Sequence, residues 1–135
     1  MDRMDKLCDF MAETIVYFND KVRNVERDRY FADRDIRSIL DKTINDMILC
    51  LVDIAEECLK KQRRNIPDTY KDTILSCYEF VGDAALKVAP LVKHRNETIH
   101  QYLKVNWQNI VTVKNKIPEI REFVAGISQT TVSRK

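Results

Sequence analysis

Residues 94–104, HRNETIHQYLK, contain both histidines of the chain together with Arg95, Asn96 and Tyr102. An arginine guanidinium binds phosphate through a planar fork of N–H donors, and an imidazole titrates close enough to neutral pH to transfer a proton. Such a pair suits cleavage of an RNA phosphodiester, in which the 2′-hydroxyl is the internal nucleophile and no metal ion is required. In this chemistry His100 takes or gives the proton, Arg95 stabilises the phosphorane charge, and Asn96 orients the imidazole or a phosphate oxygen.

On a helix, these side chains do not all point in the same direction. Asn96 and His100 are four residues apart and adjacent, while Arg95 and Tyr102 are seven apart and lie on nearly one line. Arg95 and His100 are about 140° apart around the axis and roughly 7.5 Å apart along it. A second copy of the helix across a two-fold axis would bring two arginines and two histidines into one cleft, which favours a homodimer. The spacing alone is weak evidence, because most such pairs are ordinary surface or interface residues.

The elements that must position these residues are predicted to be helices. The chain has only two glycines and three prolines, and 33% of its residues are charged. Apolar residues at spacings of three and four predict an all-α fold, an antiparallel bundle of about five helices. The expected helices span residues 2–25, 33–63, 67 or 68 to 81, 83–103 and 106–127. We expect one domain over 1–127 and a polar, disordered tail over 128–135.

A few residues mark the expected boundaries of these helices. Asp33 is the expected N-cap of the second and longest helix, and Asn106 is the expected N-cap of the fifth. Pro90 either kinks the fourth helix or restarts it at a first helical position, and Pro118 would bend the fifth. The polar connection 26–29 is expected to be tight or partly helical.

The middle of the second helix is apolar nearly all the way round, because Ile48, Leu49 and Val52 widen its main apolar face. A helix of this kind must be buried on two sides. One interpretation packs one side on the core and the other on a second copy, so that the dimer forms through this helix and the helix of residues 94–104. The other places it at the centre of the fold, surrounded by its own neighbours. The pattern favours neither.

The formal net charge of +2 is too small for a protein that coats nucleic acid through its summed field. Any contact with RNA must therefore come from local clusters. Residues 60–64, KKQRR, form such a cluster at the predicted end of the second helix. These cations either complement the dipole at a solvated helix end or contact RNA.

The remaining composition indicates an intracellular protein. Cys8, Cys50, Cys58 and Cys77 lie far apart among apolar residues, which predicts reduced core thiols. The charged start, MDRMDK, and the lack of a long apolar run predict a cytoplasmic protein that does not enter a membrane. Two histidines and scattered thiols assemble no convincing zinc site, and no glycine-rich phosphate loop is present, so neither metal nor cofactor is expected.

The segment 95–102, RNETIHQY, resembles the R-x4-H-x-Y motif of HepT-type toxins of the HEPN superfamily. The similarity extends from about Asp33 through Trp107 and Ile110 to the end of the fifth helix. It implies a HEPN-like helical bundle that dimerises through its motif helices and acts as a metal-independent endoribonuclease on tRNA or mRNA. It also implies a toxin–antitoxin system, in which a minimal nucleotidyltransferase antitoxin, MNT, neutralises the toxin by transferring AMP to the motif tyrosine.

Carried over to this sequence, the resemblance assigns Arg95 and His100 to catalysis, Asn96 to their support and Tyr102 to AMPylation. An AMP ester on Tyr102 would lie on the same helical line as Arg95. It would occupy the anion site and add bulk and negative charge where RNA must bind.

The residue before the arginine departs from the family pattern. Family members often have an apolar or aromatic residue there, whereas this chain has His94 preceded by Lys93. We favour a surface position for His94; a second titrating group and a phosphate contact are the alternatives. His94, Lys93 and Lys104 are the candidate RNA contacts.

Two other functions fit the same residues. The first is a non-catalytic helical module that binds a nucleotidyltransferase partner or a nucleotide through the same cleft. The second is a structural dimer whose motif no longer acts.

Overall fold

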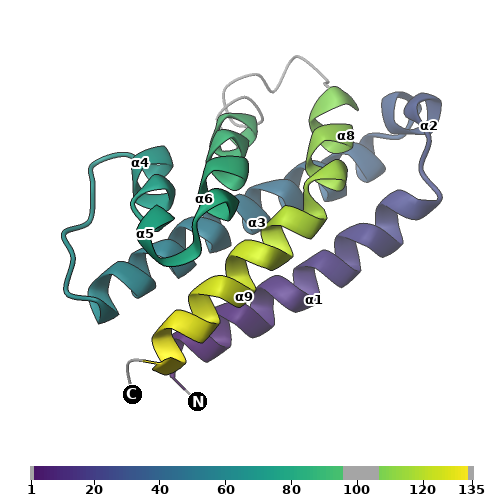
Figure 1. Cartoon of the computed structure of the whole chain (residues 1–135). Coiled ribbons are helices and arrows are strands. Elements are labelled where there is room, and N and C mark those ends of the chain that lie inside the picture. The colour runs from purple at the N-terminus through teal and green to yellow at the C-terminus, as the bar shows by residue number, and fades with distance from the viewer. Residues whose placement is uncertain (1, 96–106, 134–135) are drawn as a thin grey trace.

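The computed structural model describes residues 2–95 and 107–133, and all regular structure in these ranges is helical, so the prediction of an all-α fold is confirmed. Figure 1 shows the long helices, over residues 3–23, 34–61 and 117–133, forming a layer with shorter helices packed across it. The elements are α1 (Arg3–Arg23), α2 (Arg27–Ala32), α3 (Arg34–Lys61), α4 (Tyr70–Leu75), α5 (Tyr78–Val81), α6 (Asp83–Val88), the 3-10 turn η1 (Ala89–Leu91), α8 (Trp107–Asn115) and α9 (Ile117–Ser133).

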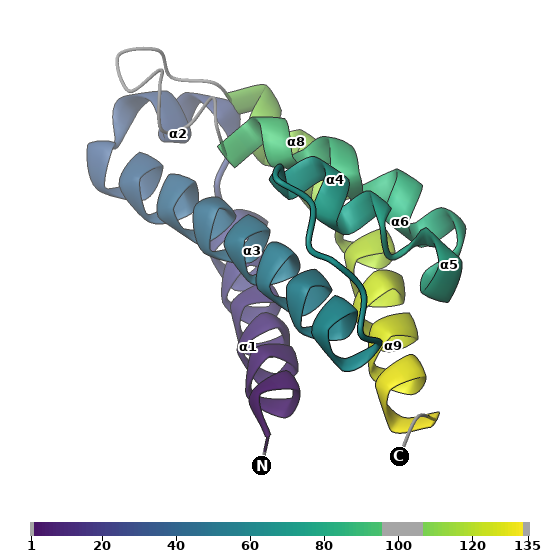
Figure 2. The same cartoon turned by 90° about the vertical axis from the view of Figure 1, so that its left-hand side faces the viewer.

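The long helix α3 is the centre of the fold. It has 28 residues, and the Asp33 carboxylate caps it by accepting hydrogen bonds from the backbone N–H groups of Asp35 and Ile36, as predicted. It packs against α1, α2, α4, α8 and α9. Figure 2 shows α1 and α9 on either side of it, with the two chain termini at the same end of the molecule.

The all-round apolar surface of α3 is covered within the single chain. Ile48 and Val52 are 1% and 2% exposed, although they lie outside the main apolar face. The interpretation of α3 as a central helix surrounded by its own neighbours is therefore confirmed. Leu49, the third residue of this surface, stays partly exposed, but the contacts of α1, α4 and α9 with α3 mean that the surface does not by itself require a second copy of the protein.

The core fills the space between α1, α3 and α9, and the shorter helices close it from one side. All four cysteines are free thiols, as predicted, and three of them are buried. Burial raises the pKa of the Cys50 thiol to about 12. The largest fully buried side chains are Tyr30, Phe18, Phe123, Met11, Leu40, Ile44, Met47, Ile48, Leu51, Ile54, Leu59 and Ile74.

The predicted third helix begins later than expected and is divided. It starts at Tyr70 rather than at Pro67 or Asp68, because the Thr69 hydroxyl caps it by accepting from the N–H of Asp72. A turn then separates α4 from α5. Gly82, with φ 65° and ψ −137°, separates α5 from α6 in a backbone conformation that residues with a Cβ rarely adopt.

The predicted fifth helix is also two helices, and it extends further than expected. The chain breaks at Lys116, and Pro118 stands at the second position of α9, where its missing N–H is tolerated. The helix α9 then continues to Ser133, so the prediction of a disordered tail is wrong for residues 128–133. Thr131 in this part is only 6% exposed, which ties the end of α9 to the bundle.

The connection between α1 and α3 contains the short helix α2, which fits the prediction of a partly helical connection. None of the helices in the described residues combines the length and apolar composition that crossing a membrane requires.

Candidate functional site

The candidate site begins in a short helical turn that follows α6. The chain passes from α6 into η1, with Pro90 inside this 3-10 turn, and becomes helical again over residues 92–95. Pro90 thus interrupts the predicted fourth helix before it resumes. Figure 1 shows that α8 begins on the side of the molecule away from the two termini.

Of the predicted site residues, Lys93, His94 and Arg95 belong to this turn. Lys93 is exposed, as a residue that contacts RNA must be. The other candidates, Asn96, His100, Tyr102 and Lys104, lie outside the described residues, as do Asn106 and the rest of the predicted fourth helix. Their assigned roles therefore stay predictions.

His94 is buried and attached to α8. Its Nδ1 lies 2.6 Å from the side-chain oxygen of Asn109, and the two residues are 6% and 7% exposed. Because the amide oxygen only accepts, His94 Nδ1 is the donor. The favoured interpretation of His94 as a surface residue is wrong, because the ring faces α8 rather than solvent. Its position favours an anchor for the segment that carries Arg95 over a direct contact with RNA.

Arg95 is half-buried and turned toward α4. Its guanidinium carbon lies 5.6 Å from the centroid of the Tyr70 ring, within the range of a cation–π contact. Its Nε is buried and has no hydrogen-bond partner among the described residues, and none of their carboxylates pairs with the guanidinium. A guanidinium whose donors are not taken by a carboxylate can bind a phosphate.

A second cluster holds the beginning of α8 in place. The rings of Tyr30 and Trp107 have centroids 5.2 Å apart, and the Tyr30 hydroxyl donates to the Asp41 carboxylate at 2.9 Å. Burial raises the pKa of Asp41, an effect that the hydrogen bond from Tyr30 and the charge of Arg37 partly oppose. Sequence reasoning missed this cluster; the signal was the tyrosine within the polar segment that joins the first two predicted helices.

The basic run 60–64 begins in the last turn of α3, and Figure 1 shows this end of α3 far from the start of α8. Lys61 pairs with Asp2 at 2.9 Å, and Arg64 pairs with Glu79 at 2.8 Å. Lys60 and Lys61 stand in the last turn of α3, where cations interact favourably with the helix dipole. These contacts support the interpretation as a helix end rather than as an RNA contact.

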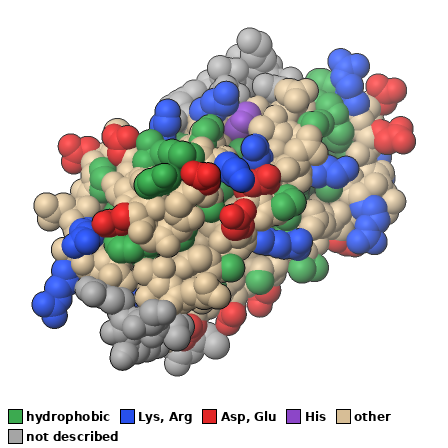
Figure 3. Space-filling model, viewed as in Figure 1, with side chains coloured by type: hydrophobic (Ala, Val, Ile, Leu, Met, Phe, Trp, Pro, Cys, Tyr) green, Lys and Arg blue, Asp and Glu red, His purple; other side chains and the backbone are tan. Residues whose placement is uncertain are grey.

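The visible surface carries mixed charge. Figure 3 shows lysine and arginine side chains interspersed with aspartate and glutamate on the face seen in Figure 1. An electrostatic attraction for RNA on this face must therefore come from individual side chains rather than from a continuous basic surface.

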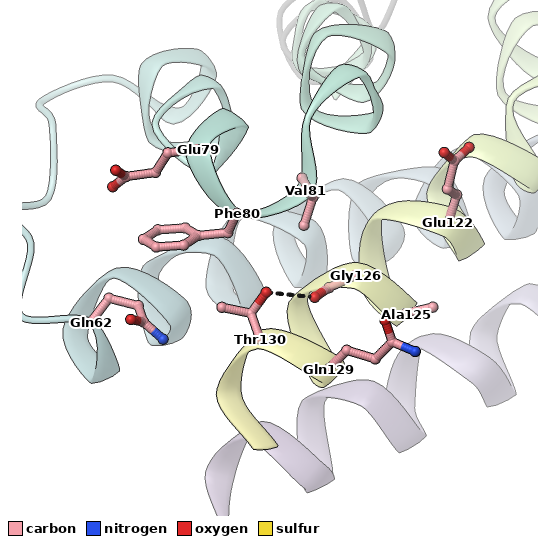
Figure 4. A pocket seen from close by; sticks show the side chains of 9 residues that line it. All are labelled: Gln62, Glu79, Phe80, Val81, Glu122, Ala125, Gly126, Gln129 and Thr130. Atoms are coloured by element: carbon pink, nitrogen blue, oxygen red, sulfur yellow. Dashed lines mark hydrogen bonds between the residues drawn. The ribbon is translucent and has the colours of Figure 1, made fainter. Parts of the chain in front are cut away.

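The groove in Figure 4 lies between the end of α3, α5 and α9, away from Arg95, and measures about 760 Å³. The Gln62 amide nitrogen is buried in it and has no hydrogen-bond partner among the described residues. Its wall is tight, because a Cβ added at Gly126 would lie 2.8 Å from Val81 Cγ1. The groove offers no histidine or arginine for phosphodiester chemistry. It is lined by Gln62, Glu79, Phe80, Val81, Glu122, Ala125, Gly126, Gln129 and Thr130.

Comparison with known protein families matches residues 6–127 to the family described as Ribonuclease HepT-like. The match spans all the described elements from α2 to α8, most of α1 and the first part of α9, and it includes the whole R-x4-H-x-Y segment. No curated protein and no solved structure gives a match.

Proposed function

Since this chain belongs to the HepT-like ribonuclease family, we propose that it is the toxin of a toxin–antitoxin pair and that it cleaves RNA without a metal ion. Membership implies ribonuclease activity and a HEPN-like fold. The observation that carries the proposal is the family match over residues 6–127 together with the R-x4-H-x-Y segment inside it. The position of the Arg95 guanidinium over the Tyr70 ring, without a carboxylate partner among the described residues, gives it physical support.

The proposed reaction is an internal transfer. The RNA 2′-oxygen attacks the neighbouring phosphorus, the bond from phosphorus to the 5′-oxygen breaks, and a 2′,3′-cyclic phosphate and a 5′-hydroxyl are formed. The neutral imidazole of one His100 takes the proton from the 2′-hydroxyl. The protonated imidazole of a second His100 gives a proton to the leaving 5′-oxygen. Arg95 stabilises the charge on the phosphorane, and Asn96 supports the imidazole or a phosphate oxygen.

The two proton transfers favour a homodimer. Each chain offers one motif histidine, and on a single helix Arg95 and His100 point about 140° apart. Two motif helices across a two-fold axis would supply one imidazole as base and one as acid in the same cleft. Because the apolar surface of α3 is already covered, the proposed interface is centred on the motif helices.

The proposed partner is a minimal nucleotidyltransferase of the MNT type, which acts with the toxin in the cytoplasm. The phenolic oxygen of Tyr102 attacks the α-phosphorus of ATP, loses its proton and releases pyrophosphate. The resulting AMP ester places a bulky phosphate seven residues from Arg95, two helical turns along the same line, and blocks the anion site.

The test is RNA cleavage by the purified protein in the presence of EDTA. We expect the wild-type chain to leave 2′,3′-cyclic phosphate ends on tRNA or mRNA, and Arg95→Ala and His100→Ala to lose at least about 100-fold in rate, as expected for loss of a charge-stabilising or proton-transfer group. Arg121→Ala, an exposed arginine of α9, is the matched control for the loss of one cation. Full activity in His100→Ala would overturn the assignment.

Co-expression with a nucleotidyltransferase of the MNT type tests the regulation. The intact mass of the toxin should rise by one AMP group, and Tyr102→Phe should abolish this increase. A stable complex between the two proteins, without RNA turnover by the free chain and without growth arrest on expression, would instead favour the non-catalytic binding module.

A further inference from the structure

Two adjacent residues of the turn 92–95 contact different helices. Successive side chains of an α-helix point about 100° apart, so His94 reaches Asn109 on α8 while Arg95 reaches Tyr70 on α4. The buried hydrogen bond of His94 fixes the turn, and the direction of Arg95 follows from it. The Tyr70 ring is then the only described aromatic group that the guanidinium contacts.

We propose that Tyr70, which lies outside the R-x4-H-x-Y segment, is a positioning residue for Arg95. This inference rests on the proposed function, in which Arg95 binds the scissile phosphate. The π face of the Tyr70 ring attracts the guanidinium. The ring forms no hydrogen bonds with the N–H donors at the edge of the guanidinium plane, so these can still bind a phosphate. A carboxylate in the same place would take those donors and neutralise the charge.

Two further observations fit this role. The Nε of Arg95 is buried without a hydrogen-bond partner among the described residues, so at least one donor is held ready in a partly desolvated place. Tyr70 itself is 40% exposed, and its hydroxyl makes no hydrogen bond within the described residues. The ring rather than the hydroxyl therefore does the positioning, and its removal takes little from the core.

The first test compares Tyr70→Phe with Tyr70→Leu in the full-length chain. We expect Tyr70→Phe to keep wild-type kcat/KM for RNA cleavage, and Tyr70→Leu to lose about 5- to 30-fold, the range of one partly desolvated cation–π contact. In an Arg95→Ala background, Tyr70→Leu should cause no further loss, because the residue acts through Arg95. Tyr78→Leu, at an exposed tyrosine of α5, is the matched control and should keep full activity with an unchanged Tm.

The second test does not depend on ribonuclease activity. In a ¹⁵N NMR spectrum, the Arg95 Nε–H signal should be shifted by the ring current of Tyr70, and inorganic phosphate should shift it further. Tyr70→Phe should keep both effects, and Tyr70→Leu should lose the first and weaken the second.

These tests separate the inference from the proposed function. If the wild-type chain is inactive but still shows the NMR effects, RNA cleavage is refuted. Tyr70 is then still the positioning residue of an arginine that binds anions. The inference is overturned if Tyr70→Leu keeps full kcat/KM, if it costs as much without Arg95 as with it, or if Tyr70→Phe loses as much as Tyr70→Leu.

Discussion

His94 and Arg95 show what the sequence reveals at the scale of single residues. The type and spacing of Arg95 were enough to make it a candidate for phosphate binding, because every guanidinium is planar and positively charged and has a fork of N–H donors that fits a phosphate. The role of His94 was not visible, because its partner Asn109 is 15 positions away on another helix. Residue types can be read directly, whereas a tertiary partner cannot be read from local spacing.

The carboxyl of Asp41 gives a prediction for the effect of pH. Its pKa is raised in the folded protein, mainly by burial, so the folded chain holds a proton there more tightly than the unfolded chain does. Ionisation of Asp41 therefore costs stability above the raised pKa, and this cost disappears as the pH falls below the ordinary value of 3.8. Asparagine carries no charge and can still accept the hydrogen bond from Tyr30.

We expect Asp41→Asn to have a larger free energy of unfolding than the wild type at pH 7, with a difference that shrinks as the pH is lowered. Urea unfolding of both proteins at several pH values between about 4 and 7 measures this difference in the free energy of unfolding. Asp20→Asn, at an exposed aspartate of α1, is the control. A difference between wild type and Asp41→Asn that stays constant over this range would contradict the assigned cost of burial.

At the scale of elements, apolar periodicity predicted the bounds of α1 and α3 to within two residues. It did not predict which elements pack against the apolar faces of these helices. The all-round apolar middle of α3 fits a central helix and a dimer interface equally, and only the packing of α1, α4 and α9 distinguishes them. Breaks were harder to predict. Proline and glycine marked the positions near Pro90, Pro118 and Gly82, but α9 continued through a polar stretch because Thr131 is buried by tertiary contact.

The contact of α5 with α9 gives a prediction of its own. Alanine at Gly126 gains about 1 kcal/mol of helix propensity, but its Cβ would lie 2.8 Å from Val81 Cγ1 and 3.2 Å from Val81 Cβ. A valine cannot move these atoms away by rotating a long side chain, so the helices must separate, which costs about 1–3 kcal/mol. We therefore expect Gly126→Ala to lower the free energy of unfolding.

The double variant tests the cause. In a Val81→Ala background the closest atom, Cγ1, is gone while Cβ remains at 3.2 Å, so Gly126→Ala should cost much less in urea unfolding or become neutral. An equal effect of Gly126→Ala in both backgrounds would show that the close approach to Val81 is not responsible.

At the scale of the whole molecule, the proposed dimer gives the clearest expectation. If the cleft takes arginine and histidine from two chains, Arg95→Ala and His100→Ala should each be inactive alone and should recover part of the activity when mixed. Each mixed dimer then contains one intact arginine and one intact histidine. RNA cleavage measured across a series of mixing ratios should reach its maximum near equal amounts.

Native mass spectrometry of the same mixtures is the control, because it shows whether mixed dimers form. Mixed dimers without any recovery of cleavage would mean that the reaction needs both motif histidines of the dimer, or that it takes its arginine and histidine from the same chain. The single chain shows a complete core, so the fold of each protomer should survive in either variant.

The hydrogen bond between His94 and Asn109 has a consequence for the energetics of catalysis. It joins two positions 15 apart and fixes the turn that carries Arg95 to α8 when the protein folds. A contact formed on folding lowers the number of backbone arrangements open to this turn. If Arg95 binds the scissile phosphate as proposed, part of the entropy cost of orienting it is therefore met during folding, before RNA binds.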